Sequence, residues 1–142
     1  MHRNLFPVPA LRLTAIGVAV AVLIGCNSGP KQGEVRGKVT FQNEAVTEGT
    51  ITFLNPNEGG AAEGTIKSDG SYSLTAKLPA GEYVVVITPP MHIVDTDPGK
   101  SPPAPVEKPM KDIPKKYRMQ GTSPLRATVK EGKNEHNFDM AP

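Results

Sequence analysis

Few residues of this 142-residue chain could carry covalent chemistry or bind a metal. It has a single cysteine, Cys26, and two histidines, His92 and His136, follow it. One cysteine cannot form an intramolecular disulfide or a cysteine-rich zinc site. Neither histidine has partners at metal-ligand spacing, so we predict structural or solvated roles for both, with no metal and no other cofactor.

Two carboxylates, Asp95 and Asp97, lie close together, but in a proline-rich stretch that we do not expect to hold them rigidly. A glycosidase needs two carboxylates fixed across a cleft. As a calcium loop, Asp95-x-Asp97-x-Gly99 is shorter than an EF-hand loop and lacks its closing Glu. The Gly-x-Ser-x-Gly motif of serine hydrolases does not occur. We therefore predict no catalytic residues and a protein that is not an enzyme.

Cys26 follows an uncharged, mostly apolar run, Leu13 to Gly25. A helix needs about 20 residues to span a bilayer, so this run is too short. It comes after a weakly positive start that carries Arg3 and Arg12, which is typical of a signal peptide. An ordinary signal peptide with an incidental cysteine and an uncleaved signal anchor are the alternatives.

The end of the run, Leu23-Ile24-Gly25-Cys26, resembles the lipobox of bacterial lipoproteins. The resemblance implies a lipoprotein signal peptide over residues 1–25, cleavage between Gly25 and Cys26, and acylation of the Cys26 thiol. Several acyl chains would make a stable membrane anchor where one is marginal. Residues 26–33 then form a flexible tether. Asn27 replaces the Asp that favours inner-membrane retention in enterobacteria, so we expect an outer-membrane or periplasm-facing location in the envelope.

The charge balance argues against a nucleic-acid partner. Two of the 16 basic residues, Arg3 and Arg12, precede Cys26, and none of the 14 acidic residues does. The part after the cysteine is therefore neutral, without the basic stripe of a nucleic-acid-binding domain. Aromatic residues make up 5% of the chain and Trp is absent, which leaves little stacking surface for sugars.

Alternating apolar and polar residues predict seven short strands, at 35–41, 50–54, 63–68, 71–76, 82–88, 125–129 and 135–140. In the fourth, we expect Tyr72, Leu74 and Ala76 to point inward. The 82–88 strand is apolar on both faces and is predicted to be central. Eight of the 15 prolines fall between Pro89 and Pro114, so residues 89–112 are predicted to form a long irregular loop.

Turn residues indicate how these strands connect. Asp69-Gly70 predicts a hairpin between the third and fourth strands, and residues 131–134 predict another between the last two. No segment has a helical period. The sequence therefore predicts an all-β domain over residues 34–142, a seven-stranded antiparallel sandwich.

Four motifs, read in order, resemble the carboxypeptidase regulatory-like domain, which has a transthyretin-like (prealbumin-like, Ig-like) sandwich. They are Val35-x-Gly37-x-Val39, Ile51-x-Phe53, Ser68-Asp69-Gly70-x-Tyr72-x-Leu74 and Leu78-x-x-Gly81-x-Tyr83-x-Val85. The tail from Ile113 to Phe138 is similar to the C-terminal part of small lipoproteins with this domain. The resemblance implies a non-catalytic accessory or adhesive module, often a stalk or spacer.

The motif residues are expected to be structural. Gly37 and Gly81 would allow close packing or an unusual φ, Tyr72 and Tyr83 would fill the ends of the core, and Asp69-Gly70 would close its hairpin.

Some related surface domains form an isopeptide bond between a lysine and an asparagine of their first and last strands. Lys38 and Asn137 occupy those strands here. Their parity is opposite to that of Val39 and Phe138, so both should point to solvent, whereas the reaction requires a buried lysine. We therefore do not expect the bond.

Taken together, these features predict a lipid-anchored, non-catalytic module of the cell envelope, for protein interaction or a structural or spacer role. The alternative is an envelope carbohydrate- or ligand-binding module that uses the 89–118 loop or an exposed sheet face. The basic run 108–118 is expected to be a solvated loop, with contact to anionic lipid headgroups or polysaccharide as the alternative.

Overall fold

The computed structural model describes residues 29–93 and 105–142. The predicted signal peptide over residues 1–25, the cleavage site between Gly25 and Cys26, and the lipidated Cys26 lie outside the described residues. So do Asp95, Asp97 and Gly99.

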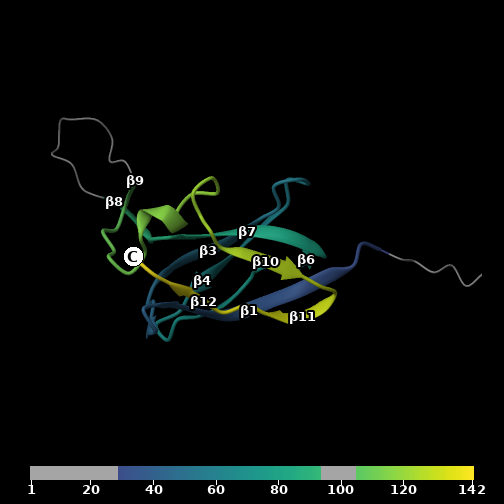
Figure 1. The fold of residues 1–142 in the computed structure, drawn as a ribbon, viewed down its shortest axis with the longest axis horizontal. Helices are drawn as coiled ribbons and strands as arrows, with labels where there is room; N and C mark the ends of the chain where they lie inside the picture. The colour runs from purple at the N-terminus through teal and green to yellow at the C-terminus, as the bar shows by residue number, and fades with distance from the viewer. Residues whose placement is uncertain (1–28, 94–104) are drawn as a thin grey trace, which may run out of the picture.

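The described part of the chain is all-β, as predicted, with one short 3₁₀ turn and no α-helix. The elements in chain order are β1 (Gln32–Phe41), β2 (Glu44–Ala45), β3 (Gly49–Leu54), β4 (Ala61–Ile66), β5 (Ser71–Ser73), β6 (Leu78–Pro79), β7 (Gly81–Thr88), β8 (Met91–Ile93), β9 (Pro105–Glu107), η1 (Lys115–Tyr117), β10 (Arg126–Val129), β11 (Gly132–Glu135) and β12 (Phe138–Met140). Two sheets enclose the core, in the manner of a sandwich (Figure 1).

The first sheet is built around β1, which pairs antiparallel with β2, β5 and β6. Its other edge pairs parallel with β11 and β12, in one continuous register from Gly33↔Gly132 to Phe41↔Met140. The expectation of a purely antiparallel sandwich is therefore wrong for this sheet. The chain enters this sheet from the opposite one at β11, and both β11 and β12 run in the same direction as β1.

The second sheet has the order β10-β7-β3-β4, and all its pairs are antiparallel. The predicted central position of the 82–88 strand is confirmed, because β7 lies between β3 and β10. Residues Tyr83 to Ile87 are all buried, which explains why that strand is apolar on both faces.

The Asp69-Gly70 turn forms, but the strands beside it do not pair with each other. β4 pairs with β3 and β5 pairs with β1, so the turn leads from one sheet to the other. Gly70 has a φ of +79° and its carbonyl accepts a hydrogen bond from the Val39 N–H at 2.9 Å. The turn is thus held against β1, the strand with which β5 pairs. Ala76, predicted to point inward, is exposed after β5 ends.

The predicted final hairpin is also wrong. β10 pairs with β7, and the next strand, β11, pairs with β1 in the other sheet. The Asn134 side chain closes this crossing, because its amide group bonds both the N–H and the C=O of Lys130. The residues predicted as a turn, 131–134, therefore mostly belong to β11.

The proline-rich segment is more regular than predicted. Within residues 89–112, β8 and β9 form a small antiparallel ribbon with His92 opposite Val106. After it, Ile113 and Tyr117 are buried in the core, and the Tyr117 hydroxyl lies 3.2 Å from the carbonyl oxygen of Ala141. The segment that follows the ribbon therefore packs as part of the domain.

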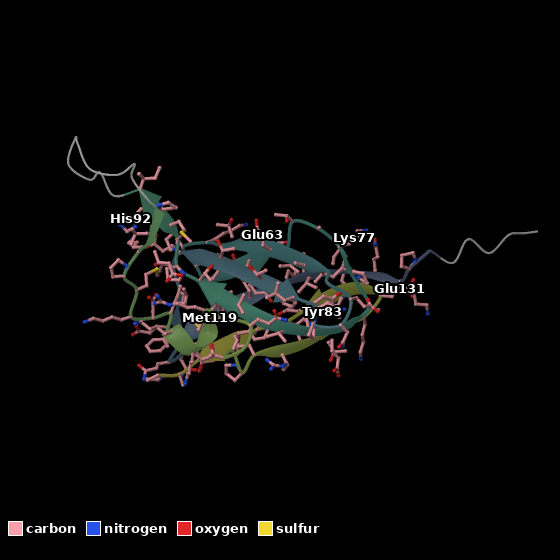
Figure 2. The ribbon with its side chains drawn as sticks, turned by 90° about the horizontal axis from the view of Figure 1, so that it is seen from above. Glu63, Lys77, Tyr83, His92, Met119 and Glu131 are labelled. Carbon is pink, nitrogen blue, oxygen red and sulfur yellow. The ribbon has the colours of Figure 1, made fainter. Side chains whose placement is uncertain are left out.

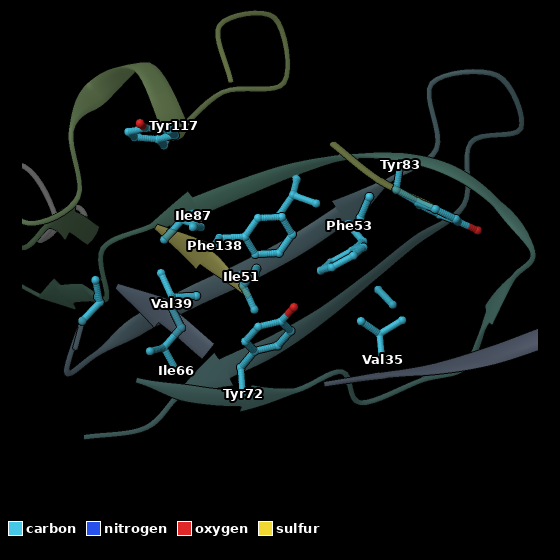
Figure 3. Packing of buried hydrophobic residues seen from close by; sticks show 14 of the residues in the cluster. Val35, Val39, Ile51, Phe53, Ile66, Tyr72, Tyr83, Ile87, Tyr117 and Phe138 are labelled. Carbon is cyan, nitrogen blue, oxygen red and sulfur yellow. The ribbon is translucent and has the colours of Figure 1, made fainter. Parts of the chain in front are cut away.

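Aliphatic and aromatic side chains from both sheets fill the core (Figure 3). Val35 and Val39 of β1 are buried, as their parity predicts, and Phe41 is partly buried. Phe53 lies near the centre, with the rings of four neighbours at centroid distances of 6.1 to 6.3 Å.

Candidate functional site

Gly37, Tyr72 and His136 meet where the β11–β12 edge is interrupted. The His136 N–H donates to the Arg36 carbonyl at 2.9 Å, and its own carbonyl accepts a hydrogen bond from the Tyr72 hydroxyl at 2.7 Å. A Cβ on Gly37 would lie 1.8 Å from that same carbonyl oxygen. The expected close packing at Gly37 is therefore present. Because Gly37 has no side chain, the His136 carbonyl can lie against β1 and accept the hydrogen bond from Tyr72.

The Asn137 side chain bridges this interruption between β11 and β12. Its Oδ1 accepts the Lys38 backbone N–H at 2.8 Å, which takes the place of a ladder bond. Lys38 and Asn137 are both exposed, as predicted. The geometry therefore lacks the buried lysine that an isopeptide bond requires.

The two tyrosines of the motifs have structural contacts. Burial raises the pKa of Tyr72 well above its ordinary value, so its hydroxyl remains a donor. Burial also raises the pKa of Tyr83, whose hydroxyl donates to the Pro79 carbonyl at 2.8 Å. Gly81 differs from Gly37, because a Cβ there would meet only ordinary contacts of 3.8 Å or more and its φ is not in the left-handed region. The expectation of close packing or an unusual φ thus does not hold at Gly81.

The outer face of the first sheet carries a shallow hollow of about 250 Å³ over the same interruption. Most of the residues that line it have polar side chains; they are Arg36, Gly37, Lys38, Ser71, Tyr72, Glu135 and Asn137. Neither Arg36 nor Lys38 has an ion-pair partner among the described residues. A guanidinium, an ammonium, a hydroxyl and an amide around one open hollow suit a hydroxylated ligand that carries a carboxylate.

Two further hollows continue along the same face, and share Glu34 and Ser73. They show that outward-facing side chains of β1, β5 and β11 form one polar surface. In the sequence, the outward-facing residues of each strand can be recognised as the polar positions of its alternating pattern. The sequence does not show which strands are neighbours in the sheet, so the hollow was not predicted.

Most basic side chains of the run 108–118 form ion pairs or hydrogen bonds with other residues of the domain. Lys108 pairs with Glu48, and the Lys116 ammonium donates to the Pro142 carbonyl oxygen. The Arg118 guanidinium donates to the carbonyls of Ile113 and Met110 and pairs with Glu107 at 2.8 Å. Of the basic residues in this run, Lys111 and Lys115 are those without such a partner among the described residues. The run therefore has a largely structural role.

Replacing Arg118 with methionine should lower the free energy of unfolding by about 2 kcal/mol, because two carbonyls and a carboxylate lose a charged donor. The Arg118 side chain is only 16% exposed, so water cannot fully replace it. Urea titration of the purified chain would measure the loss. Lys115→Met, in the same turn, should change stability by less than about 0.5 kcal/mol, and an equal loss in both variants would contradict the role given to Arg118.

Asp139 links the last strand to the turn after β1. Its carboxylate accepts hydrogen bonds from the Thr40 hydroxyl at 2.6 Å and the Asn43 N–H at 3.0 Å. The bond from Thr40, and to a smaller extent that from Asn43, holds the pKa of Asp139 below its ordinary value of 3.8. A lowered folded-state pKa stabilises the fold above the unfolded-state pKa, and this contribution is lost as the pH falls through the folded-state value.

Asp139→Asn should therefore be less stable than the original chain at pH 7, and the difference should shrink once the pH falls below about 4. Thermal unfolding followed between about pH 2 and pH 7 would show this convergence. Asp112→Asn is the control, since the Asp112 carboxylate bonds to no described residue. A difference between Asp139→Asn and the original chain that stays constant with pH would contradict the linkage.

The histidines occupy the predicted kinds of position. His136 is at the edge of the core, stacked on Phe138, with Nε2 3.1 Å from the Thr128 carbonyl oxygen. His92 is exposed on β8. Among residues 29–93 and 105–142, no three His, Cys, Asp or Glu side chains are grouped so that they could hold a metal ion. Within the same residues, no helix is long and apolar enough to cross a membrane.

Comparison with known proteins identified no relative of this chain. No family model, no curated protein and no solved structure matches this chain. The fold and the candidate site therefore define its class by themselves, as an all-β protein with a sandwich-like core and a polar hollow on the outer face of one sheet.

Proposed function

We propose that the chain is a lipid-anchored, non-catalytic module of the bacterial cell envelope, which serves protein interaction or acts as a structural spacer. The observation that carries the proposal is the lipobox-like sequence Leu23-Ile24-Gly25-Cys26 and its position before the domain. β1 begins at Gln32, so the tether would hold the domain within about 20 Å of the acylated cysteine.

The arrangement of the domain suits a spacer. Lys31 pairs with Glu131 at 3.6 Å, which places the start of β1 at the Glu131 end of the molecule. β8, β9 and η1 lie at the opposite end (Figures 1 and 2). Because a ten-residue strand such as β1 extends about 33 Å, the domain would hold its far end well above the anchoring membrane.

The interior of the domain is almost entirely hydrophobic among the described residues. Apart from the tyrosines, Ser123 is the one buried residue of the described ranges that has a polar side chain. Its hydroxyl donates to the Val85 carbonyl and accepts from the Leu125 N–H, so both of its roles are used in holding the chain. We further propose a carboxypeptidase regulatory-like relationship, which is supported by the sequence motifs and by the contacts of Gly37 and Tyr72.

Changing Cys26 to alanine tests the anchor directly. The original chain, expressed in a bacterium with a lipoprotein pathway, should sediment with membranes and give the mass of residues 26–142 plus acyl groups. Cys26→Ala should give no acylated species, because the thiol that accepts the lipid is gone. Ser28→Ala, two residues along the tether, should be acylated normally. An unacylated mature N-terminus in the original chain would refute the proposal.

The hollow over Gly37 favours a second candidate function, an envelope carbohydrate- or ligand-binding module. Acidic glycans would match Arg36 and Lys38 through their carboxylates and Ser71 and Asn137 through their hydroxyls. A glycan array with the purified chain should then show saturable binding that Arg36→Ala weakens at least tenfold. Lys111→Ala, a cation elsewhere on the surface, should have no effect. The absence of saturable binding to any acidic glycan would reject this candidate.

A further inference from the structure

The exposed large hydrophobic side chains of the described residues are all at one end of the molecule. Met91 is 66% exposed, Ile93 72% and Val106 48%, and all three belong to the β8–β9 ribbon. The fourth, Met119, follows η1, and the Arg118–Glu107 pair joins that turn to the ribbon. Figure 2 shows His92 of the ribbon at the end opposite Lys77 and Glu131.

The hydrogen-bond pattern of the ribbon determines which backbone groups are free. The Lys108 N–H donates to the Pro90 carbonyl at 3.0 Å, so this pair of residues is of the hydrogen-bonded type. Pair types alternate along an antiparallel ladder, which makes His92↔Val106 the next hydrogen-bonded pair. The N–H and C=O groups of Met91 and Ile93 therefore point away from β9, and they bond to no other described residue.

The two edges of the ribbon differ in their ability to accept another strand. Pro105 has no N–H, which removes a donor from the outer edge of β9. β8 (Met91-His92-Ile93) has no proline and no acidic, lysine or arginine side chain. By contrast, the long outer edge of β11–β12 carries Lys133, Glu135 and Asp139, charges of the kind that prevent edge pairing.

We propose that β8 is a self-association edge, at which two copies of this chain pair antiparallel about His92. In that register Met91 of each copy lies opposite Ile93 of the other. The four free N–H and C=O groups of one strand meet those of its partner in four hydrogen bonds. The Met91 and Ile93 side chains of both copies then form one apolar cluster on the same face. The product is a continuous four-stranded ribbon, β9-β8-β8-β9, with a two-fold axis at His92.

The edge chemistry favours a second copy over a lipid surface. Bilayer hydrocarbon would receive the apolar side chains but leave the backbone groups of Met91 and Ile93 without partners, at a cost of several kcal/mol each. A second β8 satisfies these groups and covers the same side chains. The seam is shorter than a standard interface, so the pairing is weak in dilute solution. Confinement on a membrane would strengthen it, although the pairing itself does not depend on the proposed anchor.

Disulfide trapping tests the register. In a non-hydrogen-bonded antiparallel pair the two Cα atoms are about 4.5 Å apart, within reach of a disulfide. The full chain carrying Cys26→Ser and His92→Cys should therefore form a covalent dimer under mild oxidation, seen on a non-reducing gel. Cys26→Ser with Val106→Cys is the control, because the two copies of residue 106 would be about 14 Å apart, three strand spacings. The introduced thiol is the only one in both proteins, whether or not Cys26 is normally acylated.

A third protein separates pairing from chance collision. Ile93→Pro removes an N–H that β9 does not use but the partner strand requires. Added to the His92→Cys chain, it should reduce the trapped dimer at least tenfold and leave the fold intact by circular dichroism. Equal trapping at positions 92 and 106, no trapping at position 92, or trapping unaffected by Ile93→Pro would overturn the proposal.

Discussion

The Gly37→Ala protein should lose about 3 kcal/mol of unfolding free energy or fail to fold, although one methyl group is a small change. The added Cβ would lie 1.8 Å from the His136 carbonyl oxygen and 2.6 Å from the carbonyl carbon. These are backbone atoms, so no side-chain rotation can relieve the overlap. β1 and the link between β11 and β12 must separate at this point.

The separation would have consequences beyond the clash. The His136 carbonyl accepts the Tyr72 hydroxyl, and the His136 N–H donates to the Arg36 carbonyl. Moving His136 away weakens both bonds and leaves the buried Tyr72 hydroxyl without its acceptor, which itself costs about 1–3 kcal/mol. The hollow on the outer face should be distorted at the same time, because Gly37 and Asn137 both line it.

Urea unfolding of Gly37→Ala beside two control glycines would measure this effect. Gly81→Ala has ordinary contacts, and Gly121→Ala has no atom within 4 Å of the new Cβ. Both controls should stay within about 0.5 kcal/mol of the original chain. A Gly37→Ala loss no larger than theirs would mean that β1 and the last strand are not in close contact.

Much of the strand content follows from alternation in the sequence. β1, β3 and β7 lie where the alternating runs predict them, because burial of one face selects apolar residues at every second position. The apolar run of β7 also predicts its central place. A strand's own pattern thus shows which of its side chains point inward.

Pairing between strands could not be predicted in the same way. Tyr72 and Phe138 point inward as their parity predicts, and the same inward pattern would result from hairpins or from crossings between sheets. The choice depends on tertiary contacts, such as the Gly70 carbonyl bonded to β1 and the Asn134 side chain at the second crossing. A turn motif such as Asp69-Gly70 predicts where the chain reverses but not which sheet receives it.

The candidate site could not be predicted from the sequence for the same reason. Arg36 of β1, Ser71 of β5 and Asn137 between β11 and β12 lie far apart in the chain, and only the sheet order brings them around one hollow. The ribbon β8–β9 was hidden by proline density, which predicts irregular structure. Its prolines lie where β9 faces outward and before β8 begins, positions that a two-stranded ribbon tolerates.

Removing the Phe53 side chain should give the other large loss of stability, about 3–5 kcal/mol for Phe53→Ala. Phe53 is fully buried, and the rings of Tyr72, Tyr83, His136 and Phe138 surround it. Tyr83 comes from the second sheet and the other three rings come from the first sheet and its β11–β12 segment, so the resulting cavity would lie where the layers meet. A small domain has only about 5–15 kcal/mol of net stability, so this variant should be close to unfolding.

Two further substitutions define what the loss means. Phe53→Leu retains most of the volume and should cost less than half as much as Phe53→Ala. Leu54→Ala removes a partly exposed neighbour on the other face of β3 and should cost about 1 kcal/mol. The urea midpoints should fall in that order, while the dependence of stability on urea stays the same, because all four proteins expose similar surface on unfolding. If Leu54→Ala were as damaging as Phe53→Ala, the core would not be centred between the sheets, and Phe53 would not be the residue that joins the two layers.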